Sequence, residues 1–469
     1  VPDPTKPTRL IPPAGQPGYS EVQLYVSHPY YLGRRLVERS NLIQVWKQFI
    51  LSAKKEIIVN VFDFDLEEVA QALVEQAQRG LDVRVGIDKK SVIDVRPEVK
   101  AVEQLLLQGG VKVTGVMPVG LNHQKMTAID WSEGDDARVL FSSGNLTRSC
   151  LEPDGDLKGT VPLPRESVPN ANHLSTMKSW LLANPVHHEL TKTLDPAYLL
   201  RGRQYPLNGA YQVTGPGIDP QTLEAYPHPS ITLTFSPGGG LKNINQNLIA
   251  QLVRRETGSI RMLQFAYSAV EVDEALLFRA QQDFQQTGKF DFQSVGDTPF
   301  AMREWSRFLI MSGLRREIDP TKQQGYFPDP ANPWVQGLSA RQLRSVQQKV
   351  FVAPKIYGNN HVNVPGQATK VKVNAKIHHK ILATPRFAIV GTSFNFSAGA
   401  ESNNEQILVF RDDQMSQAVS GMVRYLVNES PGTVLKEANR RNRFGGVRDE
   451  DSSGEVEGQQ TQGPLETAQ

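Results

Sequence analysis

The chain has 469 residues, of which 39% are hydrophobic and 21% are charged, a composition typical of a globular protein with more than one domain. Its 51 Lys and Arg residues nearly balance its 49 Asp and Glu residues, so the overall charge does not favour nucleic acid or an anionic membrane as a partner. The single cysteine, Cys150, excludes an internal disulfide framework, and every apolar run is shorter than the roughly 18 residues that span a bilayer.

The sequence begins at Val1 with a proline-rich stretch. We expect residues 1–19 to be flexible, because they include six prolines and two glycines. The stretch resembles the start of an exported protein after removal of a signal peptide, which favours a secreted or periplasmic location.

Two segments far apart in the chain follow the same order of strands and helices. The apolar patterns predict strands at 56–64, 81–88 and 259–267, and helices at 66–78, 244–255 and 272–282. Strand–helix–strand units with short connections predict an α/β fold with mixed, mostly parallel sheets flanked by helices. The repetition predicts two copies of one domain in the chain.

Changes in composition indicate where the domains end. We expect a first domain, a linker rich in Gly, Pro and Tyr, a second domain with a long insertion, and a polar, largely disordered tail. These parts cover residues 20–204, 205–228, 229–432 with the insertion at 285–370, and 433–469. The insertion carries several aromatic residues and is a candidate wall or lid for a substrate site.

The first half contains a pattern of polar residues around two predicted strands. His123 and Lys125 alternate along an extended segment, so both side chains can enter one pocket. Asp130 follows them, and Ser143 and Asn145 come directly after a strand predicted at 138–142.

The second half repeats this pattern. His378 and Lys380 lie on a strand predicted at 377–383, and Ser393 and Asn395 follow the next strand. Downstream, Glu405 precedes an apolar strand, where its carboxylate could bind the Nδ1 atom of a site histidine and fix the orientation of the ring.

These residue types suit transfer of a phosphoryl group. A neutral imidazole can attack phosphorus and form a covalent phosphohistidine, which divides one difficult displacement into two steps. An adjacent ammonium neutralises the nonbridging phosphate oxygens, and serine and asparagine side chains can bind the same oxygens. A single His-x-Lys motif is weak evidence for a catalytic site, because it often occurs by chance. Two copies in two repeated halves indicate a catalytic site.

The paired motifs resemble those of the phospholipase D superfamily, whose hallmark is a duplicated HxK(x)4D pattern followed by a GSxN-like turn. The resemblance implies two α/β/α domains related by pseudo-twofold symmetry, with chemistry that needs no metal or other cofactor. It also implies that His123 and His378 are nucleophile and general acid. Lys125, Lys380, Asn145 and Asn395 would hold the phosphate, and Glu405 would orient a histidine across the domain boundary.

The second copy departs from the family pattern, because Pro385 stands where the first copy has Asp130. Tyrosyl-DNA phosphodiesterases in the same superfamily also lack this Asp, so we still expect the chain to be an active enzyme. We favour His123 as nucleophile and His378 as general acid. The orienting partner from the first half stays open between Asp156 and the segment 170–173, in which His173 or an asparagine could take this part.

The motifs do not identify the phosphodiester that is cut. A phospholipase D acting on glycerophospholipids, with water or an alcohol as acceptor, is the reading we favour because of the apparent export and the large insertion. A nuclease or DNA-processing phosphodiesterase is the alternative, and a catalytically silent binding module is a third. The oligomeric state is left open.

Overall fold

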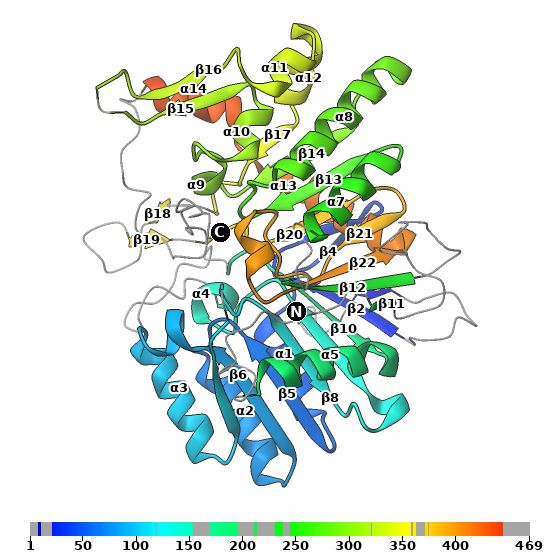
Figure 1. The fold of residues 1–469 in the computed structure, drawn as a ribbon, viewed down its shortest axis with the longest axis vertical. Coiled ribbons are helices and arrows are strands. Elements are labelled where there is room, and N and C mark those ends of the chain that lie inside the picture. The colour runs from blue at the N-terminus through cyan, green and yellow to red at the C-terminus, as the bar shows by residue number, and fades with distance from the viewer. Residues whose placement is uncertain are drawn as a thin grey trace, which may run out of the picture.

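Two mixed β-sheets form the centres of two α/β domains that meet in the middle of the molecule (Figure 1). The computed structural model of the chain describes residues 8–10, 21–118, 120–152, 169–195, 211–212, 230–237, 244–319, 321–357, 360–362, 371–373 and 375–443. The two α/β domains expected from the sequence are confirmed.

The two sheets repeat the same order of strands. The first runs β1 (Thr8–Leu10), β2 (Glu21–Val26), β10 (His173–Lys178), β9 (Arg138–Ser142), β8 (Lys125–Ile129), β5 (Glu56–Val61), β6 (Asp82–Asp88), β7 (Lys112–Val116). The second runs β11 (Tyr211–Gln212), β12 (Ser230–Ser236), β22 (Glu405–Arg411), β21 (Phe387–Ile389), β20 (Lys380–Ala383), β13 (Ile260–Gln264), β14 (Phe292–Gly296), β17 (Val350–Val352). Each strand of one sheet therefore has a counterpart in the other.

Most of the strand pairs are antiparallel, so the expectation of mostly parallel sheets is wrong. Among the named strands of the two sheets in the described ranges, only β5, β6 and β7, and their counterparts β13, β14 and β17, pair in parallel. These strands are linked by helical crossovers, whereas short connections turn the chain back between β8 and β9 and between β20 and β21. The strands that carry the motifs thus form the antiparallel part of each sheet.

Helices cover both faces of each sheet, and one helical layer is shared between the domains. The outer layers consist of α1 (Leu42–Leu51), α2 (Glu67–Gln78) and α3 (Pro97–Gln108) on the first sheet, and α7 (Ile244–Arg255) and α8 (Val270–Thr287) on the second. On the opposite faces, α5 (Trp180–Thr193) and α13 (Asp413–Glu429) contribute to a single apolar core that includes residues of both sheets. Because this core crosses the domain boundary, burying it fixes the two domains against each other.

The helices of the shared layer begin at matched polar caps. The side chain of Ser179 accepts the amide of Leu182 at the start of α5, and that of Asp412 accepts the amide of Met415 at the start of α13. Apolar residues then recur at helical spacing, for example Leu182, Val186 and Leu190 in α5.

The expected insertion at 285–370 is shorter than predicted, because it contains two strands of the central sheet, β14 and β17. Six of the additional elements lie between these strands. They are α9 (Thr298–Ala301), α10 (Arg307–Met311), β15 (Leu314–Glu317), β16 (Gly325–Pro328), α11 (Pro333–Gly337) and α12 (Ala340–Gln347).

The predicted terminal and linker segments lie largely outside the described residues. Within them, β1 pairs with β2, β11 pairs with β12, and α14 (Val434–Arg443) is a regular helix. The segment 433–469, expected to be a largely disordered tail, therefore begins with an ordered helix, whose Val434 and Ala438 are buried. Within the described ranges, no helix combines the length and the apolar character needed to cross a membrane.

The remaining described elements are short. They are β3 (Tyr30–Leu32), β4 (Arg35–Val37), a π-helical turn (Lys89–Ile93), a 3-10 turn (Gly134–Asp136), α4 (Arg148–Leu151), β18 (Asn360–Val362), β19 (Val371–Val373) and a 3-10 turn (Gly399–Ser402).

We expect Gly421→Ala to loosen the contact between the domains. A Cβ atom at Gly421, in α13, would lie 1.5 Å from the carbonyl oxygen of Tyr31 in β3. Overpacking against rigid backbone should lower the free energy of unfolding by about 1–3 kcal/mol, measured by urea denaturation. Gly399→Ala is the control, because a Cβ there meets nothing within 4 Å. Equal stability of the two variants would contradict this account of the contact.

Candidate active site

The two His-x-Lys motifs lie at the start of corresponding strands and are buried. Lys125 begins β8 and Lys380 begins β20. The exposed fraction is 1% for His123 and 2% for His378, and both lysines are fully buried. Each lysine turns back to its own histidine, since Lys125 Nζ donates to the carbonyl oxygen of His123 at 2.8 Å and Lys380 Nζ to that of His378 at 3.0 Å.

Each histidine is held by a side chain from the opposite domain. His123 Nδ1 lies 2.7 Å from Glu405 Oε2, at the start of β22. His378 Nδ1 lies 3.0 Å from Asn172 Oδ1, directly before β10. Because β22 and β10 are counterparts in the two sheets, Glu405 and Asn172 occupy equivalent positions. The motifs therefore exchange their orienting groups across the domain boundary.

Backbone pairing also links the two motifs. Asn122, next to His123, forms an isolated bridge with Asn404, and Ala171 forms one with Ile377, next to His378. The amide of His378 donates to the carbonyl oxygen of Ala171 at 3.0 Å. The histidines thus lie on short parallel contacts that join the domains.

The hydrogen bonds fix which nitrogen of each ring carries a proton. Asn172 Nδ2 donates to the carbonyl oxygen of Cys150 at 3.0 Å, so its Oδ1 is an acceptor and His378 Nδ1 is the donor. Glu405 accepts from Asn403 Nδ2 at 3.2 Å with its other oxygen, and His123 Nδ1 donates to it. Both rings are consequently oriented by Nδ1, which leaves Nε2 for chemistry.

The four polar residues after the motif strands fall into two groups. Asn145 and Asn395 follow β9 and β21, and each is 4% exposed. Ser143 Oγ bonds the Asn172 side chain at 2.9 Å, and Ser393 Oγ accepts the amide of Gln406 at 3.1 Å. The serines therefore position the strands that carry the orienting groups, and the phosphate-binding role expected for them stays a prediction.

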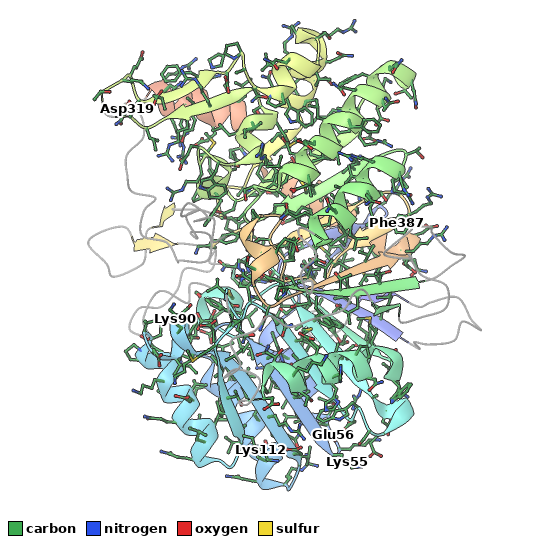
Figure 2. The ribbon with its side chains drawn as sticks, viewed as in Figure 1. Lys55, Glu56, Lys90, Lys112, Asp319 and Phe387 are labelled. Carbon is green, nitrogen blue, oxygen red and sulfur yellow. The ribbon has the colours of Figure 1, made fainter. Side chains whose placement is uncertain are left out.

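Asp130 lies at the other end of β8 from Lys125. Its carboxylate accepts the backbone amides of Lys54 and Lys55 at 2.9–3.1 Å, and the ion pair with Arg138 measures 3.6 Å. Lys55 lies at the tip of the first domain farthest from the domain boundary (Figure 2). The placement gives Asp130 a structural role in place of the catalytic one expected, and it explains why Pro385 can stand at the equivalent position.

Of the candidates for the orienting residue in the first half, an asparagine of the segment 170–173, Asn172, contacts His378. Asp156 lies outside the described residues. His173 faces His379 instead, and Asn172, its neighbour, makes the contact to His378.

Two aromatic residues in the site were not identified from the sequence. Phe62 and Phe265 directly follow the counterparts β5 and β13. The centroid of the Phe62 ring lies 5.6 Å from that of His123, and the Phe265 ring lies 4.9 Å from that of His378. Lys380 Nζ lies 5.2 Å from the Phe265 centroid. An alignment of the two repeated strands would have revealed them, because in each repeat a Phe directly follows the last residue of the strand.

A chain of three buried histidines supports the second motif. His28 Nδ1 donates to the carbonyl oxygen of Pro29 at 2.7 Å, which can only accept. His28 Nε2 lies 2.8 Å from His379 Nε2, and His379 Nδ1 lies 2.9 Å from His173 Nδ1. His173 Nε2 accepts the amide of Gly391 at 2.7 Å. A single arrangement of protons satisfies every ring nitrogen, with all three rings neutral.

Burial keeps this histidine chain uncharged. It lowers the pKa of His28 to about 4 and that of His173 to about 3. The pKa of His379 is also lowered, by burial first and then by the neighbouring His28 and His173. Because His379 lies between His378 and Lys380, the chain fixes the backbone of the second motif to both domains.

The first motif has an acid in the corresponding place. Gln124, between His123 and Lys125, accepts from Asn60 Nδ2 at 2.7 Å and donates to Glu189 Oε1 at 3.4 Å. Burial raises the pKa of Glu189 to about 8, so its carboxyl group is protonated at neutral pH. The two motifs thus have the same geometry but different supports.

The chain is similar to known proteins in part of its sequence and in its fold. Residues 46–158 match the family model described as "Cardiolipin synthase, PLD-like domain". Phosphatidylserine synthase from Haemophilus influenzae superposes with a TM-score of 0.59 at 14% identity, covering 94% of this chain and 92% of that one. Nuc from Salmonella typhimurium, a phospholipase D family member, gives 0.28 at 18% identity over 37% of this chain and 92% of that one. No curated protein matches the sequence.

The histidine chain predicts loss of stability in acid. Because the pKa values of these rings are lower in the folded state than the unfolded value near 6.5, the unfolded state binds more protons between about pH 6.5 and 3. Stability should therefore fall as the pH falls through this window. His28→Gln should reduce the change in unfolding free energy between pH 7 and pH 4 by on the order of 2 kcal/mol.

The control is His188→Gln, because His188 is exposed on α5. Buried acids such as Glu189 act in the opposite direction, so the comparison of each variant with the parent isolates the effect of the histidine. A pH dependence that is equal in the parent and in His28→Gln would contradict the neutral chain.

Proposed function

We propose that this chain, which carries a phospholipase D-like domain within the duplicated phospholipase D fold, transfers the phosphatidyl group of a glycerophospholipid to water or an alcohol. The reaction passes through a covalent phosphohistidine. The observation that carries the proposal is the exchange of orienting groups, in which Glu405 holds His123 and Asn172 holds His378 across the domain boundary.

In the first step His123 acts as the nucleophile. Its Nε2 lone pair attacks phosphorus and forms the P–N bond, while the bond from phosphorus to the leaving oxygen breaks. His378, carrying a proton on Nε2, gives that proton to the leaving oxygen. Lys380 Nζ lies 3.0 Å from His378 Nε2. When the lysine turns to the phosphate, His378 Nε2 takes up a proton from solvent, and this is the proton that it gives to the leaving oxygen.

The second step reverses the proton transfer. The hydroxyl group of water or of an alcohol gives its proton to His378, and its oxygen attacks phosphorus as the P–N bond breaks. Water yields a phosphomonoester, and an alcohol yields a new phosphodiester. His123 and His378 then return to their starting states.

The surrounding side chains stabilise the charge that develops on the phosphate oxygens. Lys125 and Lys380 supply two positive charges, and Asn145 and Asn395 supply amide groups from equivalent turns. Phe62 and Phe265 cover the histidines and lower the local dielectric, which strengthens these interactions. Glu405 and Asn172 are positioning residues, because they act through the histidines.

The difference between the two positioning residues supports the assignment of roles. A phosphohistidine formed at Nε2, with a proton on Nδ1, carries a positive ring, which the carboxylate of Glu405 stabilises. The neutral amide of Asn172 orients His378 without adding charge. The covalent intermediate is therefore better supported on His123.

The preference for lipid rests on the names of the two matches. The family model is described by a cardiolipin synthase, and the structural match over most of the chain is a phosphatidylserine synthase. Both names are those of phospholipid synthases, which favours transfer to an alcohol as well as hydrolysis.

Trapping the intermediate tests the assignment of the histidines. With bis(p-nitrophenyl) phosphate, whose leaving group needs little protonation, His378→Ala should accumulate a phosphorylated His123 after acid-free quenching. His123→Ala should show no phosphorylated protein and should lose activity by about a thousandfold or more. Mass spectrometry of the digested protein checks both. A phosphorylated His378 in the parent would reverse the roles.

A direct assay tests the substrate class. The parent should release headgroup from phosphatidylcholine or phosphatidylglycerol vesicles, and added glycerol or serine should divert product from phosphatidic acid to a new phospholipid. His123→Ala should abolish both products, while circular dichroism shows that it remains folded. Cleavage of DNA or RNA without turnover of any lipid would contradict the proposal and favour the nuclease.

A further inference from the structure

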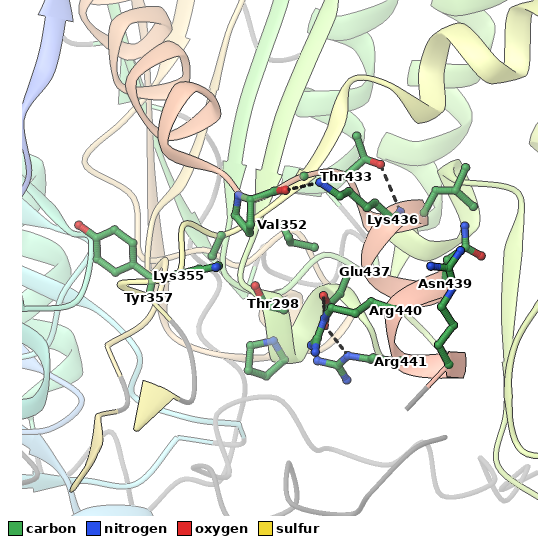
Figure 3. Close-up of a pocket in the computed structure, with 16 residues that line it drawn as sticks. Thr298, Val352, Lys355, Tyr357, Thr433, Lys436, Glu437, Asn439, Arg440 and Arg441 are labelled. Carbon is green, nitrogen blue, oxygen red and sulfur yellow. Dashed lines mark hydrogen bonds and ion pairs between the residues drawn. The ribbon is translucent and has the colours of Figure 1, made fainter. Parts of the chain in front are cut away.

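A cavity of about 970 Å³ opens in the second domain (Figure 3). Its wall is formed by the start of α9, the end of β17 and one side of α14. Neither His123 nor His378 lines it. We call this cavity the basic pocket, after the side chains described next.

Positive charge dominates the lining of the basic pocket. Five cationic side chains face a single acid, Glu437, and they are Lys355, Lys436, Arg440, Arg441 and Arg443. Glu437 binds both Arg440 and Arg441, at 2.7 and 2.9 Å. One carboxylate cannot neutralise five cations, so the pocket keeps an excess of positive charge.

Three cationic side chains of the basic pocket form no ion pair with Glu437. Lys436 Nζ donates to the carbonyl oxygen of Pro431 at 3.0 Å, which leaves its charge uncompensated. Lys355 and Arg443 are exposed, and among the residues that the structure describes neither forms an ion pair with an acid. These three side chains are suited to an anion that enters the pocket.

The basic pocket and Lys380 lie at the same end of the strands of the second sheet. Lys380 pairs with Gln264, Gln264 with Gly296, and Gly296 with Val352 at the pocket wall. Neighbouring strands are about 4.8 Å apart, so three spacings place Val352 roughly 14 Å from Lys380 along the sheet.

Direct contacts also join the pocket wall to the site. Asp297 Oδ1, directly before α9, accepts the amide of Ile377 at 2.9 Å. Phe300 in α9 packs against Phe265 with 4.3 Å between the ring centroids, and Phe265 packs against His378. The pocket and the second motif are therefore held by the same short helix.

We propose that the basic pocket is an anion subsite that holds a second phosphate group of the substrate, while the phosphodiester to be cut lies at His123 and His378. This inference rests on the proposed function for the position of the scissile group. The cavity is larger than one phosphate needs and has the size of a site for a small organic ligand, so it also admits the group that joins the two phosphates.

Paired double variants test this subsite. Lys355→Gln with Arg443→Gln removes two cations from the pocket, and Lys100→Gln with Arg254→Gln removes two exposed cations from α3 and α7 as the matched control. Phosphatidylinositol and phosphatidylinositol 4-phosphate serve as substrates that differ by one phosphate. The pocket variant should raise KM for phosphatidylinositol 4-phosphate about tenfold without changing kcat. Its KM for phosphatidylinositol, and both KM values of the control, should stay within about twofold of the parent.

Calorimetric titration with inorganic pyrophosphate measures the pocket without turnover. Binding should weaken about tenfold in the pocket variant and remain unchanged in the control. Weaker pyrophosphate binding with both KM values unchanged would assign the pocket to free phosphate and overturn the substrate subsite. An equal rise of KM for both lipids, with weaker binding to phosphatidylglycerol vesicles, would assign it to the bilayer surface and also overturn it.

The two proposals fail in different ways. If the parent turns over neither lipid, the proposed function is wrong, but the pyrophosphate titration still decides whether the pocket binds anions. If the parent turns over both lipids and the pocket variant binds pyrophosphate as the parent does, only the subsite is wrong.

Discussion

The exchange of orienting groups is the constraint on which the rest of the structure depends. A histidine that must present Nε2 to phosphorus needs a partner on Nδ1, and here that partner always comes from the other domain. The position of each ring therefore depends on the contact between the domains. The shared core around α5 and α13 supplies this contact through apolar burial, and Gly421 allows α13 to approach β3 closely.

Beneath the equivalent geometry, the two motifs are supported by different chemistry. Gln124 rests on a buried carboxyl group, Glu189, which is neutral at pH 7, whereas His379 belongs to a chain of neutral histidines. Both supports are polar, buried and uncharged, so they hold the strands without placing charge behind Lys125 and Lys380. Of the two side chains that orient the motif histidines, only Glu405 is an acid, and it contacts the nucleophile we assign.

The sequence predicted the features that depend on residues close together in the chain. The helix at 244–255 and the strand at 138–142 are confirmed at their predicted bounds, because their apolar periodicity is strong. The segment 170–173 was among the candidates for the orienting group, but the sequence could not choose Asn172 over Asp156 or His173, since the contact to His378 joins positions 206 residues apart in the chain. Strand direction was misjudged because apolar alternation does not distinguish parallel from antiparallel pairing. The motif Asp130 was expected in the site, but the length of β8 carries it to the opposite end, where it binds the backbone.

Fusion of the two domains in one chain has a consequence for what the site can become. Two identical subunits exchanging the same contacts would place one residue type at both orienting positions, because a twofold axis makes the positions identical. A single chain is free of that restriction, and here one position is Glu405 and the other is Asn172. The covalent link therefore permits a division of labour between two histidines that a symmetric dimer could not encode.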